Sequence, residues 1–86
     1  MMHKFVYYQD PGHGWVAVKR ELIDALGLAK QITAYSYQRG QTVYLEEDCD
    51  APLFINTLRE RGETVVLRSA HTDRNSHIRG YARFAA

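Results

Sequence analysis

The segment AYSYQRGQTVYLEEDCDAPLFINTLRERG, residues 34–62, decides the fold of this chain. Within it, Arg39-Gly40 separates two stretches rich in aromatic and β-branched residues, 33–38 and 41–47. Because glycine readily adopts the positive φ that a two-residue loop needs, this pattern predicts a tight hairpin of two strands.

Side chains alternate between the two faces of such a hairpin. With Gln38 opposite Gln41, Tyr35 lies opposite Tyr44, and three tyrosines share one face: Tyr35, Tyr37 and Tyr44. The other face carries Ala34, Ser36, Val43 and Leu45, which suit packing beneath a helix.

A capped amphipathic helix follows the hairpin. We expect Asp50 to be its N-cap, Pro52 to occupy its first turn and Gly62 to end it. Its apolar stripe consists of Ala51, Phe54, Ile55 and Leu58.

The same order of elements precedes this segment. Residues 4–9 and 15–18 flank the turn sequence DPGHG and predict a first hairpin, and residues 19–26 predict a short helix. Residues 63–70 read as a strand, and residues 77–84 as a last strand or a tail. The predicted fold is α+β, with two helices on one face of a mainly antiparallel sheet of four to six strands.

Size and composition indicate one domain, residues 1–86, of ordinary globular character, with 45% apolar and 24% charged residues. A chain this short buries a thin core, so self-association as a homodimer is plausible. The net charge of +1 provides no overall field for nucleic acid or a membrane surface.

The single cysteine cannot form an internal disulfide, which fits a reducing compartment. The first ten residues, MMHKFVYYQD, lack the apolar core of a signal peptide, and no stretch is long and apolar enough to span a membrane. We therefore expect a cytoplasmic protein without membrane contact.

The tyrosine face and the acidic turn that follows it are the first candidate site. Tyrosine is favoured at protein interfaces, and a block of carboxylates steers a basic partner. The candidate interface residues are Tyr35, Tyr37, Tyr44, Glu46, Glu47 and Asp48, and the partner is a host protein or a second copy of the chain.

An alternative function is the binding of single-stranded nucleic acid, in which tyrosines stack on bases and basic residues contact phosphates. The candidate nucleic-acid or anion-binding residues are Arg68, His71, Arg74, His77 and Arg79. No nucleic-acid-binding motif accompanies them, so the sequence favours the protein interface.

A third alternative is a small enzyme, either metal-dependent through Glu46, Glu47, Asp48 and His71 or acid–base through His71 and His77. The acidic turn matches no calcium-loop spacing, and carboxylates also suit a helix N-terminus without any metal. Cys49 has no catalytic-cysteine signature around it. We therefore assign no catalytic residue, no metal and no cofactor.

The run DPGHGW, then YSY, then YLEEDCDA before a Phe-containing helix, resembles small proteins encoded by tailed phages, prophages and related mobile elements. The resemblance covers residues 8 to about 79 and brings no activity with it. It implies a small accessory protein that binds, and so inhibits or redirects, a host or defence component. Together with the residues above, it predicts a non-enzymatic binding protein.

Overall fold

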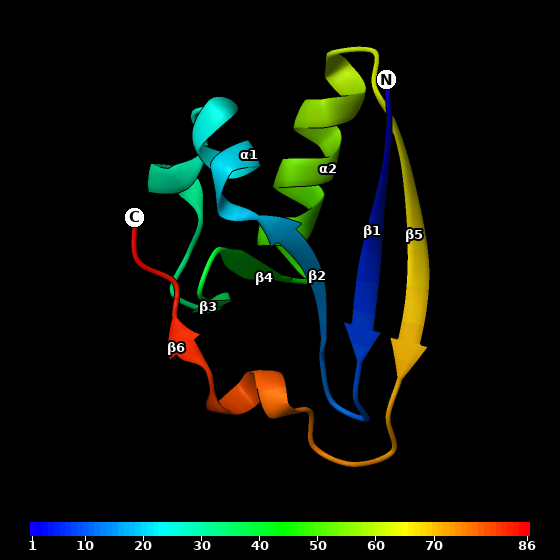
Figure 1. Ribbon diagram of the computed structural model, residues 1–86. Helices are drawn as coiled ribbons and strands as arrows, with labels where there is room; N and C mark the ends of the chain where they lie inside the picture. Colours follow the sequence, from blue (N-terminus) through cyan, green and yellow to red (C-terminus); the bar gives the residue numbers. More distant parts are fainter.

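The computed structural model describes residues 1–86, in which six strands form one sheet and two helices cover it (Figure 1). The strands are β1 (Met2–Gln9), β2 (Gly14–Lys19), β3 (Tyr37–Arg39), β4 (Thr42–Glu46), β5 (Thr64–His71) and β6 (Ala82–Arg83). The helices are α1 (Arg20–Ala25) and α2 (Asp50–Glu60), with 3₁₀ turns η1 (Ala29–Gln31) and η2 (His77–Gly80). The spatial order is β5-β1-β2-β4-β3-β6.

The first hairpin and its helix form as the sequence predicts. β1 pairs antiparallel with β2, and Tyr8 lies opposite Trp15. α1 follows directly and ends before Gly27, whose φ of 71° is one that glycine adopts without strain.

The second hairpin is present, but its predicted register is wrong by two residues. Tyr37, not Tyr35, lies opposite Tyr44, because the two-residue loop is Gly40-Gln41 instead of Arg39-Gly40. Gly40 takes the positive φ of 59° at the first loop position. A shift of two residues preserves the faces, so Tyr37 and Tyr44 still share one face.

Residues 33–36 do not extend β3, because they bind a buried carboxylate. Asp50 Oδ2 accepts hydrogen bonds from Thr33 N (3.1 Å), Thr33 Oγ1 (2.7 Å) and Ser36 Oγ (2.6 Å). This contact turns the chain away from the sheet and places Tyr35 outside it.

The prediction that Asp50 is the N-cap of α2 is therefore wrong. The cap position belongs to Cys49, which makes no side-chain cap bond. The free amides are bound instead by the carboxylate of Glu46, which accepts from Asp48 N (2.8 Å), Cys49 N (2.6 Å) and Asp50 N (2.8 Å). Carboxylate oxygens at this end of the helix also interact favourably with the positive pole of the helix dipole.

The sheet is mixed, since β5 runs parallel to β1 whereas the other four strand pairs are antiparallel. α2 carries the chain across the sheet from β4 to the far side of β1. After β5, residues 72–81 run beneath the ends of the strands to the opposite edge, where β6 pairs with β3 (Figure 1). The last predicted element is thus a 3₁₀ turn followed by a two-residue strand.

One apolar cluster lies between the sheet and both helices, which therefore occupy the same face. Its buried members include Val16, Val18, Ile23, Val43, Leu45, Phe54 and Leu58. Burying a side chain such as that of Phe54 contributes about 1.5–3 kcal/mol to folding. Neither helix is long and apolar enough to cross a membrane.

Candidate functional site: the acidic-turn cavity

A cavity of about 460 Å³ opens where the turn after β4 meets the first hairpin and the C-terminal segment. We call it the acidic-turn cavity. Its walls are formed by His13, Gly14, Trp15, Tyr35, Tyr37, Glu46, Glu47, Asp48, Cys49, Arg79 and Arg83. It thus brings together two of the three predicted interface tyrosines and all three predicted carboxylates.

The three carboxylates differ in what they bind. Glu46 holds the N-terminus of α2, and Glu47 accepts a hydrogen bond from the Tyr7 hydroxyl. Burial, followed by this contact with Glu47, raises the pKa of Tyr7 above its ordinary value. Asp48 is exposed, and its carboxylate makes no hydrogen bond within the chain. Asp48 is therefore the one of the three whose carboxylate is free of bonds within the chain.

Gly14 leaves the space that Tyr7 occupies. A Cβ atom at Gly14 would lie 2.5 Å from Cε1 of Tyr7 and 2.6 Å from its hydroxyl oxygen. The absence of a side chain at this position therefore lets Tyr7 reach Glu47 in the wall of the cavity.

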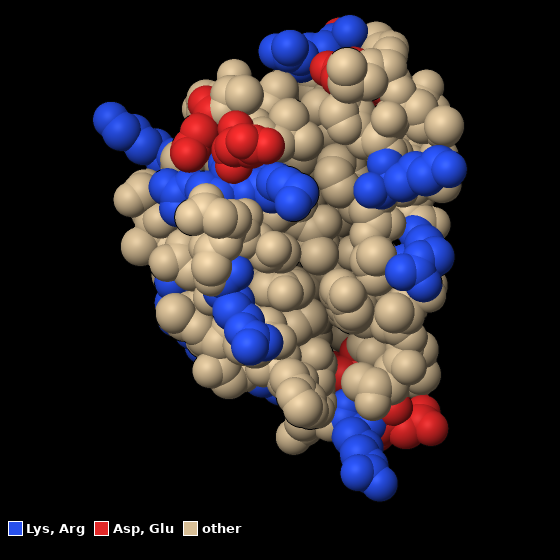
Figure 2. All heavy atoms as spheres, viewed as in Figure 1, with Lys and Arg blue, Asp and Glu red and all other residues tan.

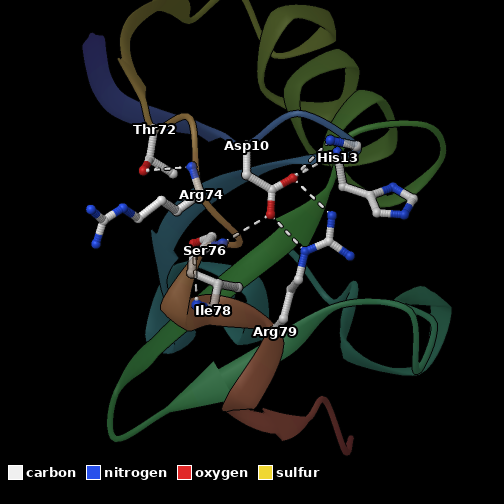
Figure 3. A network of polar contacts seen from close by, with 8 residues as sticks. Asp10, His13, Thr72, Arg74, Ser76, Ile78 and Arg79 are labelled. Atoms are coloured by element: carbon white, nitrogen blue, oxygen red, sulfur yellow. Dashed lines mark hydrogen bonds and ion pairs between the residues drawn. The ribbon is translucent and has the colours of Figure 1, made fainter.

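Another part of the lining, Arg79, is held by an ion pair with a buried carboxylate, shown in Figure 3. Arg79 donates to the fully buried carboxylate of Asp10 from Nε (2.6 Å) and Nη2 (2.8 Å). Three backbone amides, those of Gly12, His13 and Ser76, complete the shell of Asp10 at 2.9 to 3.0 Å. Such charge-assisted, two-pronged pairs fix geometry well.

This shell also fixes the charge of both partners. The Arg79 guanidinium, aided by the backbone amides, holds the pKa of Asp10 far below its ordinary range despite burial. Asp10 in turn raises the pKa of Arg79. Arg79, predicted as an anion-binding residue, is thus already bound to an anion of its own chain.

Aromatic side chains also line the cavity. Trp15 packs edge-on against Tyr37 with ring centroids 6.2 Å apart, and the guanidinium of Arg79 lies 5.6 Å from the Trp15 ring. Arg83 lies 4.7 Å over the ring of Tyr37. These contacts fasten Trp15 and Tyr37 in place, whereas Tyr35 is 73% exposed.

Tyr44, the third predicted interface tyrosine, lies in a different place. It packs against Tyr8 and Tyr81, with ring centroids 6.2 and 5.2 Å away, and burial raises its pKa. These three rings border a second cavity of about 300 Å³, the tyrosine cleft, whose other wall is Thr72, Arg74, Asn75, Ser76, His77 and Ile78. The tyrosines therefore divide between two sites.

The remaining predicted anion-binding residues do not gather at one place. Arg68 lies on β5 opposite Val6, and His71, at the end of β5, contacts Asp73 at 3.1 Å. Arg74 and His77 line the tyrosine cleft. In the view of Figure 2, Lys and Arg side chains spread over the surface, and Asp and Glu appear mainly towards its upper and lower parts.

The predicted metal set is not brought together. Glu46 lies at the end of β4, opposite Trp15 of β2. His71 lies on β5, and two strands separate β4 from β5. No group of three or more His, Cys, Asp and Glu side chains is placed to hold a metal ion.

Several residues of these sites were not predicted from the sequence, namely His13, Trp15 and Arg83 in the first cavity, Asp10, which binds Arg79, and Tyr8 and Tyr81 in the second cavity. The turn sequence at Asp10 is a signal for side-chain bonds to nearby amides. The partnership of Asp10 with Arg79 spans 69 residues and has no local signal.

Comparison with known proteins adds no relative, because no family model, curated protein or solved structure matches this chain.

Proposed function

We propose that this chain is a non-enzymatic binding protein that engages a protein partner through the acidic-turn cavity. The observation that carries the proposal is Tyr35, a large aromatic side chain 73% exposed, which lines the same cavity as the free carboxylate of Asp48. Tyrosine supplies large contact area at low entropic cost, and residues of this kind dominate binding energy at protein interfaces.

The cavity selects the chemistry of the partner. A basic side chain would meet Asp48, while an apolar or aromatic group would pack on Tyr35. Rim charges such as Asp48 contribute mainly to the association rate and its salt dependence, and desolvated aromatic groups to affinity. The partner surface is therefore basic with a central apolar group.

The rigidity of the walls supports this assignment. Glu46, Glu47 and Arg79 are each held by bonds within the chain, so binding would order few additional side chains. A preformed surface loses little conformational entropy on association. The resemblance to phage-encoded accessory proteins is consistent with such a role.

Affinity capture from host-cell lysate with matched variants tests the proposal. Tyr35→Ala and Asp48→Asn should fold as the wild type does and lose the retained partner, whereas Glu60→Gln, at the other end of α2, should retain it. If wild-type protein and Tyr35→Ala retain the same proteins in the same amounts, the proposal is wrong.

A second candidate function, binding of single-stranded nucleic acid, is favoured by the tyrosine cleft. Tyr8, Tyr44 and Tyr81 line this cleft together with Arg74 and His77. Aromatic rings next to basic residues are the combination that stacks bases and contacts phosphates. Fluorescence anisotropy with labelled oligonucleotides tests it. Binding that falls steeply with salt and is lost in Arg74→Ala would support it, and no binding at low salt would remove it.

A further inference from the structure

The free edge of the sheet at β5 is open for pairing. β5 (Thr64–His71) has eight residues and pairs only with β1, whereas the opposite edge strand, β6, has two residues (Figure 1). Proteins commonly blunt their sheet edges by making them short, charged or covered, because an open edge presents unpaired amides and carbonyls. Here the β6 edge is short and the β5 edge is long.

The hydrogen bonds to β1 show which groups of β5 are free. Thr64 N donates to Met1 O at 3.0 Å, and Thr72 N donates to Gln9 O at 2.9 Å, with an unbroken parallel register between them. Because backbone groups alternate in direction along a strand, the N–H and C=O groups of the even-numbered residues of β5 point toward β1. The N–H and C=O groups of Val65, Leu67, Ser69 and His71 therefore point away from the sheet.

Two large apolar side chains of this edge are exposed. Val66 is 44% exposed and Leu67 is 40% exposed, on opposite faces of the sheet. Leu67 borders a groove of about 330 Å³ that continues to Ile55, Pro52 and Arg59 on α2. Pairing along this edge would bury apolar surface on both faces.

We propose that β5 pairs antiparallel with β5 of a second copy of this chain, about a two-fold axis at Leu67. A two-fold axis normal to the sheet requires one residue of β5 to lie opposite its own copy, so that the outward groups of odd-numbered residues meet one another. Centring on Leu67 pairs residues 64 to 70 and centring on Arg68 pairs residues 65 to 71, whereas every other centre shortens the pairing. The Arg68 register would place the two arginines face to face, so Leu67 is the favoured centre. The product is one continuous sheet of two copies.

Charge favours a second copy as the occupant. Arg68 is the only Lys, Arg, Asp or Glu residue in β5, and in this register it lies opposite Val66 instead of opposite the other Arg68. Like charges directly opposite across a strand pair destabilise it, and this arrangement avoids them. The net charge of +1 gives little long-range repulsion between two copies.

Sedimentation equilibrium of the purified chain tests the dimer and its register. The wild type should dimerise, and Leu67→Glu should weaken the dimer by about tenfold, because it replaces a buried apolar contact with two carboxylates placed face to face. Val66→Glu is the matched control, since it places each new carboxylate opposite Arg68 of the other copy and should preserve the dimer. A monomeric wild type at its highest soluble concentration, or equal effects of the two substitutions, overturns the proposal.

Cross-linking decides the register even if Leu67→Glu fails to fold. Leu67→Cys in a Cys49→Ser background places two cysteines in a directly opposed pair, about 5.5 Å apart between Cα atoms, within the range a disulfide spans. Oxidation should give a covalent dimer for Leu67→Cys and little for Val66→Cys. Equal yields from both variants, or none from either, would contradict the two-fold axis at Leu67.

Discussion

Arg79 and Asp10 lie 69 residues apart in the sequence and form a two-pronged ion pair, with N···O distances of 2.6 and 2.8 Å. The pair fastens the C-terminal segment to the turn of the first hairpin. Since Arg79 also lies over the ring of Trp15, the positions of two residues that line the acidic-turn cavity depend on the same contact.

Loss of Arg79 should therefore loosen this part of the cavity lining. Arg79→Leu leaves the buried Asp10 carboxylate without its charged partner, and we expect the Tm to fall by several degrees. Trp15 is the only tryptophan and is 3% exposed, so its fluorescence should shift to longer wavelength as water reaches it. In a double-mutant cycle with Asp10→Asn, additive losses in Tm would contradict direct coupling.

The same pair makes stability depend on acid. The folded-state pKa of Asp10 is far below its ordinary value of 3.8, so its contribution is fully present above that value. As the pH falls through about 3.8, Asp10 becomes protonated in the unfolded state but stays ionised in the folded state. The contribution of Asp10 to the free energy of unfolding is therefore progressively lost. The difference in Tm between wild type and Asp10→Asn should be constant above about pH 5 and shrink below pH 4. A difference that grows on acidification would contradict this assignment.

Glu46 and Asp48, two residues apart, should behave differently in stability measurements. Glu46→Ala removes the acceptor for three amides at the start of α2, and we expect a loss of about 1–2 kcal/mol in the free energy of unfolding. Asp48→Ala removes an exposed carboxylate without a partner and should change stability by less than about 0.5 kcal/mol. Chemical denaturation of both variants checks this, and equal losses would contradict the capping role of Glu46.

Gly14→Ala should displace Tyr7 from Glu47. The added Cβ atom would overlap the Tyr7 ring, so we expect lower stability and a fall in the Tyr7 pKa towards its ordinary value. Ultraviolet difference titration follows the tyrosines, and Tyr7→Phe identifies the affected one. A titration curve unchanged by Gly14→Ala would show that Tyr7 keeps its position.

The local signals of the sequence predicted the elements well. The alternation of residues 41–47, the turn at DPGHG and the glycines that end both helices each act within a few residues, and the hairpin–helix order follows from them. The faces of the second hairpin were also correct for Val43 and Leu45, both buried, because alternation does not depend on the register shift of two residues.

Long-range contacts explain what the sequence did not predict. Strand β3 is shorter than expected because Asp50 binds Thr33 and Ser36 from another element, which overrides the strand propensity of residues 33–36. The parallel pairing of β5 with β1 depends on the path of α2, which crosses the sheet and ends beside β1. The separation of Tyr35 from Tyr44 follows from the first of these contacts, so the single tyrosine face became two sites.

Site-specific photo-crosslinking at position 35 tests the central claim most directly. A photoreactive phenylalanine analogue replacing Tyr35, expressed in host cells, should trap one protein on illumination, and the same analogue at Glu60 should not. A Tyr35 crosslink that disappears when Asp48→Asn is added would confirm that both residues face the same partner. No protein trapped at position 35, or the same proteins trapped at both positions, would contradict binding through the acidic-turn cavity.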